Sequence, residues 1–215
     1  MPTHEVISRM TVREKAVAFT FDDGPNPEFT PQILDIFREA GAKATFFMIG
    51  TQMEKSLGTA QAVHEQGHEI GNHTYTHPAL PEVSPDECRR ELAQTEELIV
   101  RVTGSKPRVF RPPYVAINAE VAAIAAGEFG YRSIGAVNGA ATDWEMPGVR
   151  HIVDKTREAL TPGSVLLFHD GFDDRSQTVE AVRILVSELT REGYRLVTVS
   201  ELLEMREDDW KNPID

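Results

Sequence analysis

Two adjacent carboxylates, Asp22 and Asp23, directly follow an apolar run at residues 16–21. Side chains alternate along a strand, so the two acids cannot both point into a core. Gly24-Pro25 then ends the strand and leaves the pair at its C-terminal tip. Buried carboxylates there are costly unless a cation binds beside them. Asp-Asp-Gly is also common turn chemistry, so the rest of the chain must decide between a cation site and a solvated turn.

A histidine pair, His73 and His77, is the second candidate group. The spacing of four residues lets two imidazoles converge in one helical turn. With a carboxylate from the Asp22-Asp23 pair, they would form a His-His-Asp set that leaves positions open for water and substrate. Imidazole with carboxylate suits zinc, and cobalt or nickel would also fit. The pattern therefore predicts a divalent metal site.

Further polar residues follow later apolar runs, in Arg111-Pro-Pro-Tyr114, Asp143-Trp144 and His169-Asp170. The C-terminal ends of the strands in a parallel sheet gather functional groups at one edge. Together with the carboxylates and the histidine pair, these residues predict a metal-hydrolase site. We interpret Asp170 as a turn residue after its strand.

Other motifs give weaker signals. His64-Glu-Gln-Gly-His68 matches the zinc-protease pattern H-E-x-x-H, which requires a continuous helix. Gly67 is a helix stop and His68 begins the next strand, so we interpret both histidines as structural. The chain has no Gly-x-Ser-x-Gly elbow, G-x-G-x-x-G or P-loop, which argues against serine-hydrolase and nucleotide chemistry.

The elements that must position these groups alternate along the chain. Strand-like runs occupy residues 16–21, 44–49, 69–72, 109–110, 132–137, 165–168 and 195–199. Helical patterns occupy residues 30–41, 51–66, 84–103, 118–129, 149–160, 178–192 and 200–206. Thr30-Pro31 predicts a helix start, with Thr30 as N-cap. About seven strand–helix units without a linker predict a single α/β domain with a parallel sheet, either open or closed into a barrel.

Composition sets outer limits on function. The chain has 215 residues and a formal net charge of -12, which disfavours nucleic acid as a partner. Its only cysteine, Cys88, excludes an internal disulfide and a cysteine-based zinc cage. No apolar run has transmembrane length, and the N-terminus has no apolar signal core. We expect no membrane insertion and a cytoplasmic protein, or an extracellular one if a leader has been removed; the oligomeric state stays open.

Five ordered segments resemble the motifs of the NodB-type polysaccharide deacetylases, also called carbohydrate esterase family four. The segments are Thr20-Phe-Asp-Asp-Gly-Pro25, His73-Thr-Tyr-Thr-His-Pro78, Arg111-Pro-Pro-Tyr114, Asp143-Trp144 and Leu166-Leu-Phe-His-Asp170. The resemblance implies one NodB domain over residues 1–215, with its catalytic core at about 15–203. It selects a distorted (β/α) barrel with about seven parallel strands from the architectures that the pattern permits.

The resemblance also implies the roles of the first two motifs. Asp22 would be the general base that activates water, with Arg111 pairing with it and orienting it. Asp23 would bind the metal together with His73 and His77.

For the remaining motifs, the resemblance implies the residues that handle the substrate. The backbone N–H of Tyr114 would stabilise the oxyanion. His169 would be the general acid that protonates the leaving amine, and Asp143 would hold its imidazole. Trp144 and Leu167 would line a small apolar pocket for the acetyl methyl group.

The activity implied is metal-dependent removal of acetyl groups from N-acetylglucosamine-containing saccharides, such as chitin oligomers or peptidoglycan. Two alternatives stay open: an O-acetyl xylan esterase or small-molecule amidase or deformylase on the same site, and a non-catalytic carbohydrate-binding relative. Val115 stands where the family usually has glycine, and Ala140 where it often has aspartate. A β-branched residue disfavours positive φ, so we expect the loop at Val115 to differ from that of the family.

Overall fold

A seven-stranded sheet forms the centre of the protein, described here from a computed structural model that covers residues 6–206. The predicted domain span of 1–215 therefore extends past the described residues at both ends. The strands are β1 (Ala16–Asp22), β2 (Thr45–Met48), β3 (Glu69–Asn72), β4 (Val109–Phe110), β5 (Arg132–Ser133), β6 (Val165–His169) and β7 (Arg195–Leu196).

Strand β1 pairs with three other strands, more than any other strand of the described sheet. The order is β5-β4-β3-β2-β1-β6, with β7 pairing to the start of β1, and every pairing is parallel. All seven residues of β1 are buried, as expected for a parallel strand covered on both faces. The register places Asp22 beside His169 of β6 and Phe47 of β2. The C-terminal ends of these strands thus meet at one edge, as the strand-end motifs predict.

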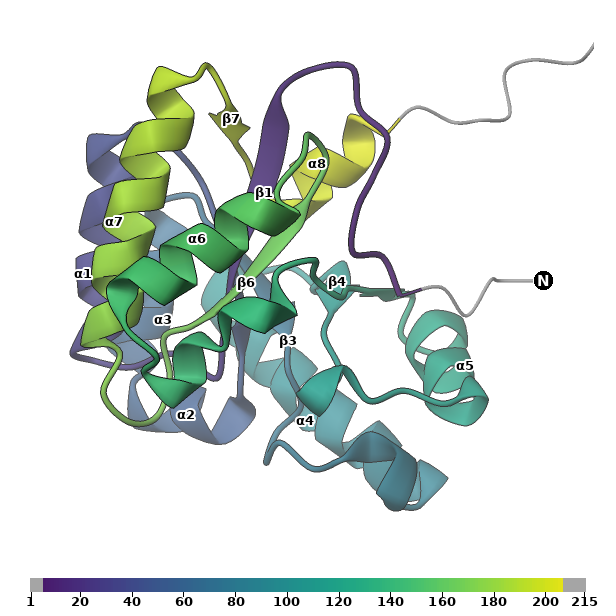
Figure 1. Cartoon of the computed structure of the whole chain (residues 1–215). Coiled ribbons are helices and arrows are strands. Elements are labelled where there is room, and N and C mark those ends of the chain that lie inside the picture. The colour runs from purple at the N-terminus through teal and green to yellow at the C-terminus, as the bar shows by residue number, and fades with distance from the viewer. Residues whose placement is uncertain (1–5, 207–215) are drawn as a thin grey trace, which may run out of the picture.

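The N-terminal segment, residues 7–10, lies between the two ends of the sheet. The backbone N–H of Ile7 donates to the carbonyl of Ser133 in β5, and the carbonyl of Ser8 accepts from Val165 in β6. In Figure 1 this purple stretch passes beside β4 before the chain enters β1. These bonds link both edges, and the sheet curls into the predicted distorted (β/α) barrel of seven strands in a single domain.

Helices surround the sheet. They are α1 (Phe29–Glu39), α2 (Gly50–Lys55), α3 (Leu57–Glu65), α4 (Pro85–Thr103), α5 (Ala119–Gly127), α6 (Val149–Ala159), α7 (Ser176–Arg191) and α8 (Val199–Glu204). Short 3₁₀ turns occupy η1 (Leu80–Glu82), η2 (Pro113–Val115), η3 (Gly139–Ala141) and η4 (Asp143–Glu145). Helices α1, α7 and α6 pack in a row on one side (Figure 1). No helix in the described range is long and apolar enough to cross a membrane.

An aromatic cluster supports β1 beneath the strand ends. Phe19 stacks on Phe168 with ring centroids 5.5 Å apart, and Phe21 stacks on Phe46 at 5.0 Å. Phe37 of α1 meets Phe19 and Phe21 edge-on. Each buried phenylalanine stabilises the fold by roughly 1.5–3 kcal/mol. The cluster thus fixes β1 and β6, the two strands that end at Asp22 and His169.

Three local predictions were wrong. Helix α1 begins at Phe29, because the side chain of Asn26 accepts the N–H groups of Glu28 and Phe29; Thr30 therefore is not the N-cap. The single helix predicted at 51–66 is two helices, because Ser56 leaves the helical conformation with φ -136° and ψ 48°. The runs at 132–137 and 195–199 form regular strands of only two residues each, although single backbone bonds from Ile134, Val137 and Val197 continue the pairing.

Candidate active site

The guanidinium of Arg111 fixes Asp22 from below the edge of the sheet. Arg111 follows β4 and is fully buried, and its Nη1 donates to Asp22 Oδ1 at 2.7 Å. The same nitrogen donates to the hydroxyl of Thr20 at 2.7 Å, and Nη2 donates to the carbonyl of Gly135 at 2.8 Å. The guanidinium carbon also lies 4.3 Å from the centroid of the Phe47 ring. A buried arginine with this many partners has one orientation, so Asp22 is held in place.

Histidines 73 and 77 lie in a loop after β3, not in the helical turn that their spacing suggested. Thr74 and His77 have φ angles of 67° and 66°, in the left-handed region. Asn72 accepts the N–H of Thr74 through its side chain, and the Thr74 hydroxyl accepts the N–H of His77. These bonds offset the cost of the left-handed residues and bring both imidazoles to the same side.

Glu91 of α4 holds the middle of this loop. Its Oε2 accepts the backbone N–H groups of Tyr75 and Thr76, each at 2.7 Å, and its Oε1 accepts the Thr76 hydroxyl at 2.6 Å. Glu91 is buried with only 3% exposure. Its carboxylate therefore takes the place of the backbone partners that this irregular segment lacks.

Asp23, His73 and His77 meet as three potential metal ligands. Their ligand atoms lie within 4.8 Å of one another, with Asp23 Oδ1 at 3.5 Å from His73 Nε2 and 3.3 Å from His77 Nε2. The Nδ1–H of His73 donates to the carbonyl of Arg111 at 2.6 Å, so Nε2 carries the lone pair. Asp23 Oδ1 is buried with no hydrogen-bond partner. Lone pairs that face one another in a buried place fit a cation between them.

The ionisation of this group agrees with a cation site. Burial by itself would raise the pKa of Asp23, but the imidazoles of His73, His169 and His77 outweigh it and lower the pKa to about 2. Burial and the neighbouring His73 lower the pKa of His77. At neutral pH an ionised carboxylate thus faces a neutral imidazole of His77, which is the protonation state that metal ligation requires.

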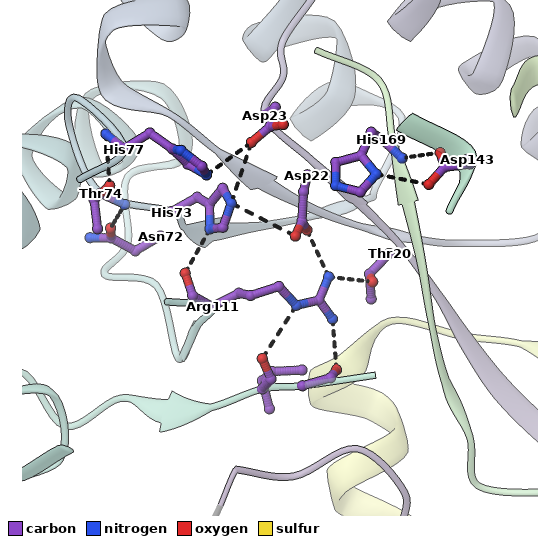
Figure 2. A network of polar contacts seen from close by, with 12 residues as sticks. Thr20, Asp22, Asp23, Asn72, His73, Thr74, His77, Arg111, Asp143 and His169 are labelled. Carbon is purple, nitrogen blue, oxygen red and sulfur yellow. Dashed lines mark hydrogen bonds and ion pairs between the residues drawn. The ribbon is translucent and has the colours of Figure 1, made fainter. Parts of the chain in front are cut away.

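On the other side of Asp22, His169 is paired with Asp143 (Figure 2). The Nδ1–H of His169 donates to Asp143 Oδ1 at 2.8 Å, and its backbone N–H donates to Oδ2 at 2.8 Å. Burial opposes the charged imidazolium, but the hydrogen bond to Asp143 and the negative charges of Asp143, Asp22 and Asp23 together outweigh it and raise the pKa of His169. The imidazole can therefore carry a proton at higher pH than an isolated histidine.

A cavity of about 490 Å³ joins the two sides. It is lined by Asp22, Asp23, His73, His77, Tyr114, Val115, Gly139, Trp144, Leu167 and His169. The Trp144 ring meets His169 edge-on at 5.2 Å, and the Tyr114 ring meets His77 at 4.8 Å. Eight of the ten predicted site residues line this cavity. The other two lie directly behind it, since Arg111 bonds to Asp22 and Asp143 bonds to His169.

The backbone at Val115 adopts a conformation that its residue type disfavours. Val115 has φ 54° and Tyr114 has φ 59°. The β-branched Val115 therefore adopts a left-handed conformation that is unfavourable for such a side chain. The turn closes through the N–H groups of Val115 and Ala116, which donate to Pro112 and Pro113. Among the described residues, none accepts a hydrogen bond from the backbone N–H of Tyr114.

Sequence reasoning missed several supporting residues. The amide of Asn138 pairs with both backbone groups of Leu167, at 2.7 and 3.0 Å, and so extends the sheet beside the cavity.

Asp170 is fully buried rather than a surface turn residue; it contacts the Thr30 hydroxyl, and burial raises its pKa to about 7. Thr178 and Glu91 lie on helices, where no local pattern marks them.

His68 of the H-E-x-x-H match does not line this cavity. Its Nδ1 accepts the backbone N–H of Ala44, and its ring packs edge-on against Phe37 and Phe46. Glu65 ends α3 and His68 comes after that end, so no continuous helix carries both histidines. A zinc-protease helix is therefore absent from this segment.

Comparison with known proteins agrees with these observations. A sequence model of the polysaccharide deacetylases matches residues 9–134. The chain belongs to the polysaccharide deacetylase family. It is thus a deacetylase of the hydrolase class, as the five motifs predict.

Three members of this family show how far the similarity extends. A Bacillus cereus peptidoglycan-N-acetylglucosamine deacetylase is 39% identical over 206 residues, covering 95% of this chain and 96% of the relative. A chitooligosaccharide deacetylase of Bradyrhizobium sp. is 34% identical over 202 residues, covering 87% and 90%. The solved Bc1960 peptidoglycan N-acetylglucosamine deacetylase superposes with a TM-score of 0.86 at 33% identity and covers 91% of each chain.

Proposed function

We propose that this polysaccharide deacetylase is a divalent-metal-dependent hydrolase that removes acetyl groups from N-acetylglucosamine units of poly- or oligosaccharides. The observation that carries the proposal is the arrangement around Asp22, with the Asp23–His73–His77 group on one side and the His169 imidazole on the other (Figure 2). The names of the relatives from Bacillus cereus and Bradyrhizobium support chitin oligomers or peptidoglycan as the substrate class.

The metal would be held by Asp23, His73 and His77. Two imidazoles and a carboxylate suit zinc, and cobalt or nickel would also fit. When bound, the ion would supply Lewis-acid chemistry, lowering the pKa of water and polarising the acetyl carbonyl. The carbonyl of Arg111 supports this assignment because it fixes the His73 tautomer that leaves Nε2 free.

Asp22 would act as the general base. Its carboxylate takes a proton from water while the water oxygen forms a bond to the acetyl carbon. Arg111 keeps this carboxylate oriented through the 2.7 Å bond to Oδ1, which leaves Oδ2 for the water. The backbone N–H of Tyr114 would donate to the carbonyl oxygen as that oxygen gains negative charge.

His169 would act as the general acid. Its Nδ1–H is bound to Asp143, so Nε2 is the nitrogen available to the substrate. The raised pKa favours the imidazolium, which gives its Nε2 proton to the sugar nitrogen as the C–N bond breaks. Acetate and a free amine leave. Trp144 and Leu167 would enclose the acetyl methyl group on the wall of the cavity.

Acetate release from N-acetylglucosamine oligomers tests this proposal. Chelated protein is measured before and after addition of zinc or cobalt, and the Asp22→Asn variant is measured beside it. We expect turnover only with metal, and a loss of at least about a hundredfold in kcat for the variant, because general base catalysis contributes about 10²–10⁴-fold. The variant should still bind zinc, since its ligands are intact.

A panel of other acyl compounds sets the limits of the proposal. Acetylated xylan, peptidoglycan and small N-acyl amides are assayed under the same conditions. Faster turnover of xylan esters or small amides than of sugar amides would replace the proposed substrate class. Metal binding without release of acetate from any of them would indicate a non-catalytic carbohydrate-binding relative.

A further inference from the structure

The carboxylate of Asp143 receives a hydrogen bond from outside its pair with His169. Asp143 is buried with 1% exposure, and its Oδ2 accepts the hydroxyl of Thr178 at 2.9 Å. Thr178 is fully buried in the first turn of α7, and 35 positions separate it from Asp143 in the sequence. With two bonds from His169 and one from Thr178, the Asp143 carboxylate is held by three donors.

The hydrogen bond from Thr178 comes from a different element than the two hydrogen bonds from His169. The other two donors both belong to His169: one is its imidazole, and the other is its backbone N–H at the end of β6. Thr178 therefore adds an anchor on a second element, helix α7. The segment carrying Asp143 is the single turn η4, bounded by Thr142 and Met146 with φ angles of 40° and 55°. Such a turn has no regular backbone ladder to keep it rigid. Helix α7, with 16 residues and an apolar face in the core, is rigid by comparison.

A second residue at the start of α7 links the same two segments. Arg175 is buried with 4% exposure, and its Nε donates to the carbonyl of Gly171 at 2.9 Å. Its Nη1 lies 3.4 Å from the carbonyl of Trp144, in the turn that carries Asp143. The N-terminal end of α7 therefore contacts the chain just after each member of the general-acid pair, His169 and Asp143.

We propose that Thr178 is a positioning residue for the acid step, holding the Asp143 carboxylate so that the His169 imidazole keeps its proton-donating orientation. The inference rests on the function proposed above. Orientation matters because a proton is transferred only when donor and leaving nitrogen align within hydrogen-bond distance. Thr178 touches no substrate and acts only through Asp143.

The reaction offers a way to separate this role from a purely structural one. An amide nitrogen must be protonated as the C–N bond breaks, whereas 4-nitrophenolate leaves 4-nitrophenyl acetate without a proton. The Thr178→Val variant keeps the volume of the side chain and loses the hydroxyl. We expect it to lower kcat for N-acetylglucosamine oligomers about 10–100-fold, with KM within about twofold and ester hydrolysis within about threefold, because general acid catalysis is worth about 10²–10⁴-fold.

Two further variants serve as controls. Thr178→Ser keeps the hydroxyl and should restore most of the amide activity. Thr45→Val removes an equally buried hydroxyl that donates to the Glu69 carboxylate at 2.8 Å, where β2 and β3 begin, away from the cavity. It should lower the melting temperature without a selective loss of amide turnover. Equal losses on amide and ester in Thr178→Val, or an amide kcat within threefold of wild type, would overturn the proposal.

A measurement without substrate separates failure of this inference from failure of the proposed function. The Nδ1–H proton of His169, bound to Asp143, is observed by NMR in zinc-loaded protein. It should exchange with water faster in Thr178→Val and at the wild-type rate in Thr178→Ser. If wild type releases no acetate from sugars, the proposed function fails while this exchange still tests Thr178; an unchanged exchange rate in Thr178→Val would reject the positioning role.

Discussion

Arg111 supports two groups of the site, the proposed general base Asp22 and the proposed metal ligand His73. Its guanidinium orients Asp22, and its carbonyl accepts the Nδ1–H of His73 and so exposes Nε2 to Asp23. The guanidinium is itself held by Thr20 and by the carbonyls of Ile134 and Gly135, which follow β5. The position of a base and the tautomer of a ligand therefore depend on the same buried side chain and peptide. A lysine there could supply the charge but not the forked set of donors.

Single-residue chemistry also predicts how the protein responds to acid. Burial, followed by the nearby Lys43, lowers the pKa of His68 to about 4, whereas an exposed histidine in the unfolded chain titrates near 6.5. The unfolded state therefore binds more protons than the folded state between these values. The buried, neutral His68 therefore contributes its full stabilisation above pH 6.5. As the pH falls towards 4, the free energy of unfolding decreases by about 3 kcal/mol through this residue.

The test compares wild type with His68→Asn, in which the amide oxygen can still accept the N–H of Ala44. The free energy of unfolding is measured with denaturant from pH 7.5 to 4, with chelator present throughout. Wild type should lose about 3 kcal/mol more than the variant over this range. Parallel pH curves would mean that His68 does not titrate between the two states as its burial requires.

At the scale of elements, the sequence could predict the strand tips because parallel connectivity brings them together. Asp22 and His169 each end an apolar run, and the register sets them side by side. What no pattern could supply are contacts made by helices that arrive later in the chain. Thr178 reaches Asp143 and Glu91 reaches Tyr75 only after α7 and α4 have packed. Residues of this kind look like ordinary helix residues in the sequence.

Helix α4 holds the loop of His73 and His77 through the carboxylate of Glu91. Glu91→Gln replaces one carboxylate oxygen by an amide group, which cannot accept the N–H groups of Tyr75 and Thr76 or the hydroxyl of Thr76 all at once. The loop that presents His73 and His77 should loosen. We expect zinc affinity to fall about 10–100-fold, the range found for lost supporting contacts around metal ligands. Calorimetric titration of chelated protein with zinc measures it.

Glu96→Gln is the matched control on the same helix. Glu96 accepts the hydroxyl of Tyr131 at 2.7 Å and pairs with Lys106, so it makes no contact with the histidine loop. The zinc affinity of Glu96→Gln should stay within about threefold of wild type, while the stability of this variant falls. Equal affinities in wild type and Glu91→Gln would show that the loop keeps its shape without the carboxylate.

At the scale of the whole molecule, the proposed metal would join segments that the fold brings together from distant parts of the chain. Asp23 follows β1, the strand that pairs with β2, β6 and β7, whereas His73 and His77 follow β3. Arg111 adds β4 to the same network. A cation at this point would therefore bind the folded barrel and not the unfolded chain, so binding must add to the stability of the entire domain.

Removal of metal should accordingly lower the melting temperature. Free zinc at a hundred times its dissociation constant stabilises a folded protein by about 2.7 kcal/mol, which for a chain of this size corresponds to about 5–10 °C. Scanning calorimetry with chelator and with buffered zinc measures the difference. In Asp23→Asn the carboxylate ligand is gone, so the two curves should nearly coincide, whereas Asp22→Asn should retain the shift. A zinc-dependent shift of wild-type size in Asp23→Asn would place the cation elsewhere in the molecule.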